Sequence, residues 1–274
     1  MKKSWSGERL ETFILGRDSI EHLHRYALAM DFVENKIVLD IACGNGYGSY
    51  LISEKAAFVY GVDIDQKTIN EAKILYPKKN INFLTGSADN IPVLDHSVDV
   101  VVSFETIEHH DKHDEMMAEI KRVLKNDGIL IISTPDKLYY TDYRKKFKNE
   151  FHVKELYKDE FKLLLSKYFN NTLLLSQKYY HGISVINEYN NSNEIITYSG
   201  NYEKVGKELS DPLFMVIIAS NSEIKKNTPS FFNGTKIIET GGIDSIEKSY
   251  NYKVGKFILS PFKFFLKIMK RNNL

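Results

Sequence analysis

The sequence predicts a doubly wound α/β fold, in which helices cover both faces of a mainly parallel sheet. Short apolar runs that end in acidic residues alternate with segments of helical periodicity, and this alternation implies right-handed crossovers between parallel strands. The first apolar run leads into a glycine-rich turn at a helix start. With 274 residues, of which 43% are hydrophobic, the chain can bury one substantial core and a small accessory region.

Composition and charge exclude several classes of protein. The net charge of +1 does not provide the basic surface that nucleic-acid binding usually requires, so no nucleic-acid partner is expected. The single cysteine, Cys43, excludes an intramolecular disulfide framework and a cysteine-built zinc site. No N-terminal apolar segment of the secretory type and no run of eighteen apolar residues is evident, so we expect a cytoplasmic location.

Residues 1–35 precede the first strand and are expected to form a helical cover over the ligand pocket. A helix is predicted from Ser19, a plausible N-cap, to Phe32, with four residues at helical spacing: Leu23, Tyr26, Ala27 and Met30. A second interpretation remains open, in which the polar residues of this segment only solvate its outer face: His22, His24 and Arg25.

The glycine-rich turn follows the apolar run Ile37-Val38-Leu39. Its spacing is Gly44-x-Gly46-x-Gly48, which differs from the G-x-G-x-x-G of dinucleotide-binding turns. Asp40 lies four residues before the first glycine, and a carboxylate there suits a ligand with an amino group or a sulfonium better than a phosphate. The alternative is an ordinary turn between a strand and a helix.

Three further strands with acidic ends follow the turn. The run 59–63 ends in Asp63, at the place where a doubly wound fold positions the carboxylate that holds a ribose diol. The run 81–84 precedes Asp89, and the run 98–104 precedes Glu105. Helices are expected at 47–55 and 65–76, the second stopped by Pro77.

Together, the turn and these acidic strand ends resemble the class I S-adenosylmethionine-dependent methyltransferases. The resemblance covers residues 36–220 and implies a Rossmann-like, seven-stranded sheet with S-adenosylmethionine as the cofactor. It places Asp40, Gly44 and Gly46 at the methionine portion and Asp63 at the ribose hydroxyls. It places Ala88 and Asp89 at the adenine with Ile64 beside the ring. Further cofactor contacts are implied at three positions: Ala42, Tyr47 and Phe104.

A narrower resemblance covers residues 6–177. Gly7-Glu8-Arg9, the phrase EHLHRY at 21–26 and the phrase STPDKLYYTD at 133–142 are similar to a methyltransferase group associated with bacterial surface-polysaccharide biosynthesis, including O-antigen. This implies O-methylation of a sugar or glycan at the cytosolic membrane face. Asn149-Glu150-Phe151-His152 departs from the Asn-Pro-Phe-His of that group. Alternatives are a methyltransferase for a quinone, lipid or other small metabolite, and a non-catalytic cofactor-binding scaffold.

The segment 104–110 carries the residues best suited to metal binding or acid–base catalysis. On a helical turn, Glu105, Glu108 and His109 share one face. This pattern resembles the metal site of the small-RNA terminal 2′-O-methyltransferases, in which a downstream histidine, here His152, completes a set suited to Mg²⁺ or Mn²⁺. Metal-free relatives carry a similar turn. Without a metal, catalysis would rest on Glu105 with His109 or His152, either of which can act as the general base. His152 is alternatively a loop histidine that anchors a backbone carbonyl.

The second half of the domain is expected to complete the sheet. A helix at 111–127 precedes a buried strand at 129–135, and a helix at 158–169 precedes an antiparallel pair of strands at 172–176 and 213–220. The segment 177–212 between that pair is rich in Tyr, Asn and Ser and predicts a substrate-side insertion. Aromatic faces and amides suit a sugar; the alternative is a polar surface insertion.

The C-terminal region departs from the compact domain. Residues 221–249 are interpreted as a linker or an irregular cap, and residues 250–274 as a basic amphipathic tail with six basic residues and no acid. Such a tail can lie peripherally on the inner, anionic face of a membrane. Alternatively, it docks on the body of the protein or on a partner such as a glycosyltransferase.

Overall fold

A computed structural model describes residues 14–144, 149–189, 195, 197–207, 211–224 and 229–248. The predicted tail at 250–274 and the phrase Gly7-Glu8-Arg9 lie outside the described residues. None of the described helices is both long enough and apolar enough to cross a membrane.

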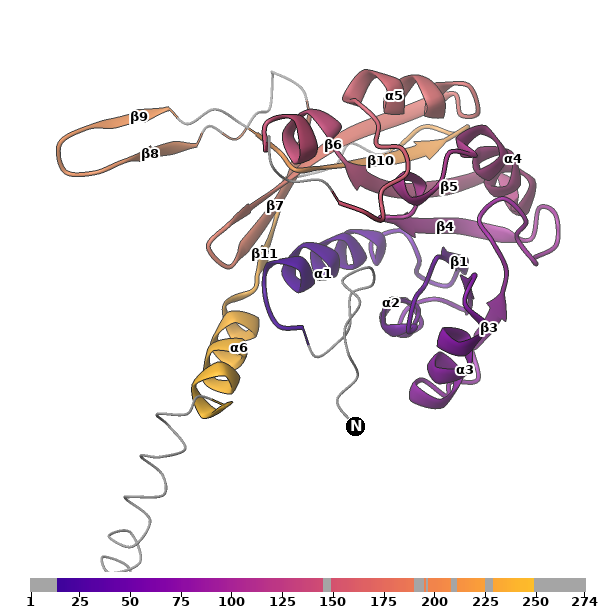
Figure 1. Ribbon diagram of the computed structural model, residues 1–274. Helices are drawn as coiled ribbons and strands as arrows, with labels where there is room; N and C mark the ends of the chain where they lie inside the picture. Colours follow the sequence, from indigo (N-terminus) through magenta and orange to yellow (C-terminus); the bar gives the residue numbers. More distant parts are fainter. Residues whose placement is uncertain are drawn as a thin grey trace, which may run out of the picture.

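Nine strands form one mixed sheet in the described part of the chain, in the order β11-β7-β6-β10-β5-β4-β1-β2-β3 (Figure 1). The parallel half contains β1 (Ile37–Ile41), β2 (Phe58–Asp63), β3 (Ile81–Thr85), β4 (Val98–Phe104) and β5 (Leu124–Pro135). The antiparallel half contains β6 (Asn171–Tyr180), β7 (Ile183–Glu188), β10 (Phe214–Ser220) and β11 (Ser230–Asn233). The predicted antiparallel pair at the end of the domain is therefore present as β6 and β10.

The predicted count of seven strands is wrong, because β7 and β11 extend the sheet beyond β6. Residues 177–212 contribute the end of β6, the whole of β7 and a separate hairpin of β8 (Tyr198–Gly200) and β9 (Val205–Lys207). Residues 221–249, interpreted above as a linker or irregular cap, contain β11 and helix α6 (Thr235–Lys248). These strands were not predicted because the segments that contain them are mostly polar. In the structure β7 pairs with β6, and β11 pairs with β7.

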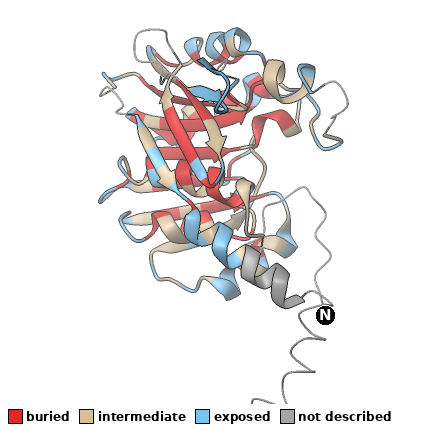
Figure 2. Cartoon of the chain, turned by 90° about the vertical axis from the view of Figure 1, so that its left-hand side faces the viewer, coloured by how far each residue is buried: buried red, intermediate tan, exposed pale blue. Residues whose placement is uncertain are grey.

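Helices cover both faces of the sheet, as predicted for a doubly wound fold. One face carries α1 (Arg17–Ala29), α2 (Tyr47–Ile52) and α3 (Gln66–Leu75), and the other carries α4 (His113–Val123) and α5 (Lys158–Ser166) (Figure 1). The helix predicted at 111–127 is shorter than expected, because the chain enters β5 at Leu124. Buried residues are concentrated in the central strands between these two helical layers (Figure 2).

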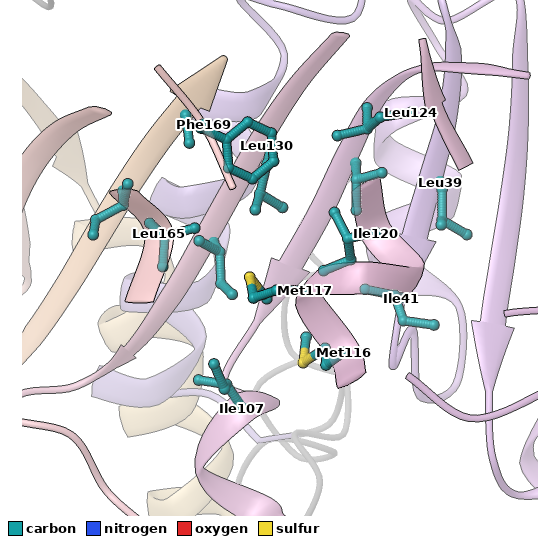
Figure 3. Close-up of a cluster of buried hydrophobic side chains, with 14 of the residues drawn as sticks. Leu39, Ile41, Ile107, Met116, Met117, Ile120, Leu124, Leu130, Leu165 and Phe169 are labelled. Atoms are coloured by element: carbon teal, nitrogen blue, oxygen red, sulfur yellow. The ribbon is translucent and has the colours of Figure 1, made fainter. Parts of the chain in front are cut away.

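The core follows the alternation of side chains along β1. Leu39 and Ile41 point toward α4 and α5, where they join Met116, Met117 and Ile120 in one cluster (Figure 3). Val38 joins a second cluster that packs under α1 and α2. The side chain of Asp40 points to the face opposite to that of Leu39 and Ile41, where it contacts Tyr26 of α1 and Ser49 of α2. This polar residue is therefore buried on the face that also carries the glycine-rich turn.

Helix α1 buries part of its polar face, which corrects the interpretation of a solvated outer face. His24 is 3% exposed and Arg25 is fully buried, whereas Ala27 is exposed. The antiparallel half of the sheet supplies their partners. Arg25 Nε donates to Gln177 Oε1 of β6 at 2.7 Å, and the two ring nitrogens of His24 bond to the hydroxyls of Ser184 in β7 and Ser230 in β11. The helix begins at Arg17 rather than at the predicted N-cap Ser19, whose hydroxyl donates to the carbonyl of Ile14.

Candidate active site

A cavity of about 470 Å³ lies at the carboxyl ends of β1, β2 and β4, where ligands bind in doubly wound folds. Helix α1 contributes His22 and Tyr26 to its wall, so this helix covers the cavity from one side. Eight of the ten predicted cofactor contacts lie in the wall: Ala42, Gly44, Tyr47, Asp63, Ile64, Ala88, Asp89 and Phe104. Asp40 and Gly46 do not line it.

Gly46 has a structural reason to be glycine. It precedes α2 with φ of 85°, in the left-handed region, and a Cβ at this position would lie 2.7 Å from the Phe83 ring. A Cβ on Gly48 would collide with the Tyr26 ring. Glycine at these two positions therefore allows the turn to pack closely against Phe83 of β3 and Tyr26 of α1.

Asp40 lies beneath the turn rather than in the cavity wall. Its two carboxylate oxygens accept hydrogen bonds from the hydroxyls of Ser49 and Tyr26, at 2.7 and 3.3 Å. Burial raises the pKa of Asp40 to about 7, against the opposing effect of these hydrogen bonds. In this structure Asp40 ties the first strand to α1 and α2, which is a different position from the direct methionine contact that the resemblance implied.

Asp63 lies in the cavity wall at the end of β2. Its carboxylate accepts from the backbone N–H groups of Gly44 and Asp65, both at 2.9 Å, so the ends of β1 and β2 are held together. Asp89 follows the adjacent strand β3 and also lies in the wall, where hydrogen bonds from Lys112 and Ser87 hold its pKa down to about 2. The two acids predicted for ribose and adenine are therefore brought to one cavity from separate strands.

The acid–histidine turn after β4 is not one continuous helical face. Glu105 has φ of 52°, and only 107–109 form a short helix, so the side chain of Glu105 departs from the predicted i, i+3, i+4 alignment. Its carboxylate accepts from Ser133 Oγ at 2.6 Å and pairs with Arg25, whose Nη1 lies 3.2 Å away. Glu105 lines the cavity, but the structure does not bring it into the predicted metal cluster.

Glu108, His109 and His152 do converge, with one potential ligand atom from each lying within 4.8 Å of the others. Glu108 is fully buried, and burial raises its pKa well above the usual value. Its Oε2 accepts from Thr134 Oγ1 at 3.1 Å, whereas its buried Oε1 has no hydrogen-bond partner among the described residues. A buried carboxylate oxygen without a partner is costly unless a proton or a cation satisfies it.

The two histidines are held in defined orientations. His109 Nδ1 donates to the carbonyl of Phe151 at 3.0 Å, because a carbonyl can only accept, and this assigns the unprotonated position of the neutral ring to Nε2. His152 Nδ1 donates to Glu155 at 2.6 Å, and its Nε2 accepts from Asn149 at 2.9 Å. The rings lie 5.2 Å apart and nearly perpendicular. His109 lines the cavity, but His152 does not.

The sequence did not single out several other residues of this site. Glu155 and Tyr140 orient His152, the second by stacking at 5.4 Å between ring centroids, and Arg25 reaches Glu105 from α1. The spacing of Glu155, three residues after His152, is a signal that the sequence contained. Ten further residues line the cavity: His22, Tyr26, Ile41, Cys43, Gly86, Ser87, Thr106, His110, Asp111 and Lys112.

Comparison with known proteins gives a match over the strands that build the cavity. Residues 39–132 match a family model described as a methyltransferase domain. A probable S-adenosylmethionine-dependent methyltransferase of Mycolicibacterium smegmatis is 38% identical over 119 residues, which are 43% of this chain and 46% of that protein. A fatty-acid O-methyltransferase of the same organism is 31% identical over 135 residues, or 48% of this chain and 46% of that protein.

A phthiotriol/phenolphthiotriol dimycocerosates methyltransferase of Mycobacterium ulcerans is 32% identical over 130 residues, 47% of this chain and 45% of that protein. The chain therefore spans about half the length of these curated relatives. Among solved structures, an S-adenosylmethionine-dependent methyltransferase of Thermotoga maritima superposes with a TM-score of 0.53 at 19% identity and covers 74% of this chain and 92% of its own. The YcgJ protein of Bacillus subtilis gives 0.54 at 18% identity, with 74% and 100% coverage. At these identities the likeness shows the fold.

Proposed function

We propose that this chain, which carries a class I S-adenosylmethionine-dependent methyltransferase domain, methylates an oxygen atom of a lipid or a similarly apolar small metabolite. The observation that carries the proposal is His109 in the wall of the cavity, with its Nδ1–H bonded to Phe151. Support for an apolar acceptor comes from relatives whose names give lipid substrates, a fatty acid and phthiotriol dimycocerosates.

One group of residues in the cavity wall would bind the cofactor, and a second group would act on the acceptor. Bound S-adenosylmethionine supplies an electrophilic methyl group on its sulfonium. Asp63 and Asp89, both in the cavity wall, provide carboxylates for the ribose hydroxyls and the adenine edge. Methyl transfer is an in-line displacement, so these residues contribute mainly by positioning.

His109 provides the base. Its Nε2 can accept the proton of the acceptor hydroxyl, because the ring proton is held on Nδ1 by the carbonyl of Phe151. The pair His152–Glu155 lies behind His109 and fixes the loop that supplies that carbonyl. An acceptor that is already ionised, such as a carboxylate, would need His109 for orientation and not for proton removal.

The same cluster fits a divalent cation, Mg²⁺ or Mn²⁺, as a second arrangement. Glu108, His109 and His152 would hold it, and the buried Oε1 of Glu108 is the unpartnered atom that such an ion would satisfy. Both imidazoles donate Nδ1–H to an oxygen, as histidine ligands commonly do. A cation at Nε2 of His152 would replace its hydrogen bond to Asn149. When bound, such an ion would grip the acceptor oxygen and lower its affinity for a proton.

A sugar or glycan acceptor remains a second prediction, for which the relatives named above offer no support. The tyrosines that suggested it have other partners: the hydroxyls of Tyr180 and Tyr189 bond to Thr197 and Asp136, and Arg17 lies over the Tyr179 ring. These contacts reduce the aromatic surface available to a sugar. We therefore favour the apolar acceptor over the polysaccharide assignment.

The test is S-adenosylmethionine turnover with fatty acids, long-chain alcohols, quinols and nucleotide sugars. Each acceptor is assayed with chelator and then with added Mg²⁺ or Mn²⁺. We expect activity on an apolar acceptor, and activity on nucleotide sugars alone would contradict the proposal. Activity that is lost with chelator, restored by metal and absent in Glu108→Ala would establish the cation. Activity indifferent to chelator would leave His109 as the base. Cofactor binding without turnover on any acceptor would favour a non-catalytic scaffold.

A further inference from the structure

A rim of exposed apolar side chains lies beside the acid–histidine turn. It consists of two segments, 137–144 and 149–158, which we call the acceptor rim. Four apolar or aromatic side chains of the rim are exposed: Tyr143 at 66%, Phe151 at 38%, Val153 at 64% and Tyr157 at 37%. Exposed side chains of this kind that gather beside a binding site mark an interaction surface more often than scattered ones do.

The two segments of the rim form one surface. Thr141 Oγ1 donates to Glu155 at 2.6 Å, Tyr157 Oη donates to Asp142 at 3.0 Å, and the backbone N–H of Lys137 donates to the carbonyl of Leu156 at 3.1 Å. Tyr139 and Tyr143 contact each other edge to face. These links hold the exposed side chains at one side of the molecule, rather than on independent loops.

The rim is bonded directly to the acid–histidine turn. The carbonyl of Phe151 accepts from His109, and the backbone N–H groups of Val153 and Lys154 donate to the carbonyl of Glu108 at 2.8 and 3.0 Å. A molecule that contacts Phe151 and Val153 therefore lies next to the residues proposed to bind the acceptor oxygen. The rim is placed to receive the part of an acceptor that extends out of the site.

Basic residues accompany the apolar side chains. Lys137 lies over the Tyr157 ring at 4.7 Å, Arg144 lies over the Tyr140 ring at 5.5 Å, and Lys154 is exposed beside Val153. The rim has three acids and four basic residues. Glu155 binds His152 and Thr141, Asp142 accepts from Tyr157, and Glu150 is exposed. Aromatic rings combined with lysine and arginine are typical of surfaces that lie at the interface of an anionic bilayer.

We propose that the acceptor rim docks on an anionic lipid surface, so that the acceptor enters the site from the bilayer. This inference rests on the proposed apolar acceptor, and it places a membrane contact on the catalytic domain itself, independently of residues 250–274. Docking of this kind removes the need to bring a water-insoluble acceptor through solution, because the exposed apolar side chains enter the same interface that dissolves it.

The experiment is co-sedimentation of the full chain with phosphatidylglycerol vesicles and with phosphatidylcholine vesicles. We compare the wild type with Val153→Glu and with Val205→Glu. Val205 is 70% exposed on the β8–β9 hairpin, so this variant is a matched control that places the same charge away from the rim. Val153→Glu should weaken binding to phosphatidylglycerol on the order of fivefold or more, because it places an unfavourable charge in the anionic interface. Val205→Glu should bind as the wild type does.

Two further measurements keep the result unambiguous. Binding of S-adenosylhomocysteine by both variants should equal that of the wild type, which shows that the domain is folded. Lys154→Gln should bind less tightly at low salt and show a weaker salt dependence, since one screened charge is lost. Equal loss in the Val153 and Val205 variants, or no loss in the Val153 variant, would overturn the proposal. A dimer that is lost in Val153→Glu would do so as well, by showing that the rim binds a second copy.

These outcomes are independent of turnover. Failure to methylate any apolar acceptor, with rim-dependent vesicle binding intact, would remove the proposed function and leave the docking surface. Loss of vesicle binding only on deletion of residues 250–274 would assign the membrane contact to the tail and overturn the role of the rim.

Discussion

The two halves of the site are built differently. On the side proposed for the cofactor, the wall comes from residues at or directly after the ends of β1, β2 and β3, and the Asp63 carboxylate accepts a hydrogen bond from the backbone N–H of Gly44. On the acceptor side, Glu105 depends on Arg25 of α1 and Ser133 of β5, and His109 depends on Phe151. The cofactor side therefore depends on turns at the ends of neighbouring strands, whereas the acceptor side is assembled from partners far apart in the sequence.

The largest difference between the two sides is expected for a substitution of His109, which should change turnover without changing cofactor affinity. With an acceptor that carries a hydroxyl, His109→Gln should lower turnover by roughly 10²–10⁴-fold, because the group proposed as the general base is lost. The affinity for S-adenosylhomocysteine, measured by calorimetry, should stay within about twofold, since His109 serves the acceptor side. Glu203→Gln, on the exposed β8–β9 hairpin, is the control. A large fall in cofactor affinity would show that the two sides are not separable at this residue.

A smaller effect is expected at the contact that joins α1 to the acceptor side. Arg25→Met should lower the free energy of unfolding by about 2–4 kcal/mol, because it removes the partner of Glu105 and of Gln177 in a buried site. Urea denaturation measures this loss.

The double variant Arg25→Met with Glu105→Gln should recover part of the lost free energy of unfolding. The glutamine is neutral, so it leaves no unpaired carboxylate charge when the arginine is removed. If the two substitutions were simply additive, the ion pair would not be the source of the effect.

A third effect is a pH dependence of stability at Asp40, beneath the glycine-rich turn. Asp40 has a folded-state pKa of about 7, above its value of about 3.9 in the unfolded chain. The native state therefore holds a proton that the unfolded state releases, so Asp40 makes stability fall as the pH rises from about 4 to about 7. Asp40→Asn should flatten this fall by up to about 1.4 kcal/mol per pH unit.

The measurement is the unfolding free energy of both proteins at several pH values across that window. Other acids with raised pKa values, such as Glu108 and Glu21, contribute to the slope of both proteins and so cancel in the comparison. Parallel curves for wild type and variant would contradict the assignment to Asp40.

Much of the cofactor side could be predicted from the sequence. The apolar run that ends in Asp63 and the two that precede Asp89 and Glu105 were enough to place all three acids at one edge of the sheet, because parallel strands bring their carboxyl ends together. The position of Asp40 was not predictable from the motif. Whether a carboxylate after a buried strand faces the ligand or the layer beneath depends on which hydroxyls pack against it, here those of Ser49 and Tyr26.

The acceptor side and the sheet extension were less predictable. Glu105 left the expected helical face because its backbone is left-handed, which no spacing rule revealed. The strands β7 and β11 contain Ile, Val and Phe, which favour strands, but each is short and lies within a polar stretch of the chain. They gain their stability from neighbouring strands, which a short local pattern does not reveal. The same strands provide Ser184 and Ser230, whose hydroxyls form hydrogen bonds with the buried ring of His24.

The sequence by itself determined the doubly wound fold, the glycine-rich turn and the acidic strand ends of the cavity, because these depend on periodicity and on backbone conformations a few residues long. The tertiary structure decided that Asp40 lies beneath the turn, that His109 and not His152 lines the cavity, and which residues of α1 are buried. Those outcomes depend on partners such as Gln177 and Phe151, which lie 152 and 42 residues from the groups that they hold. Contacts of such separation leave no periodic trace, since each partner is selected by its place in the folded sheet.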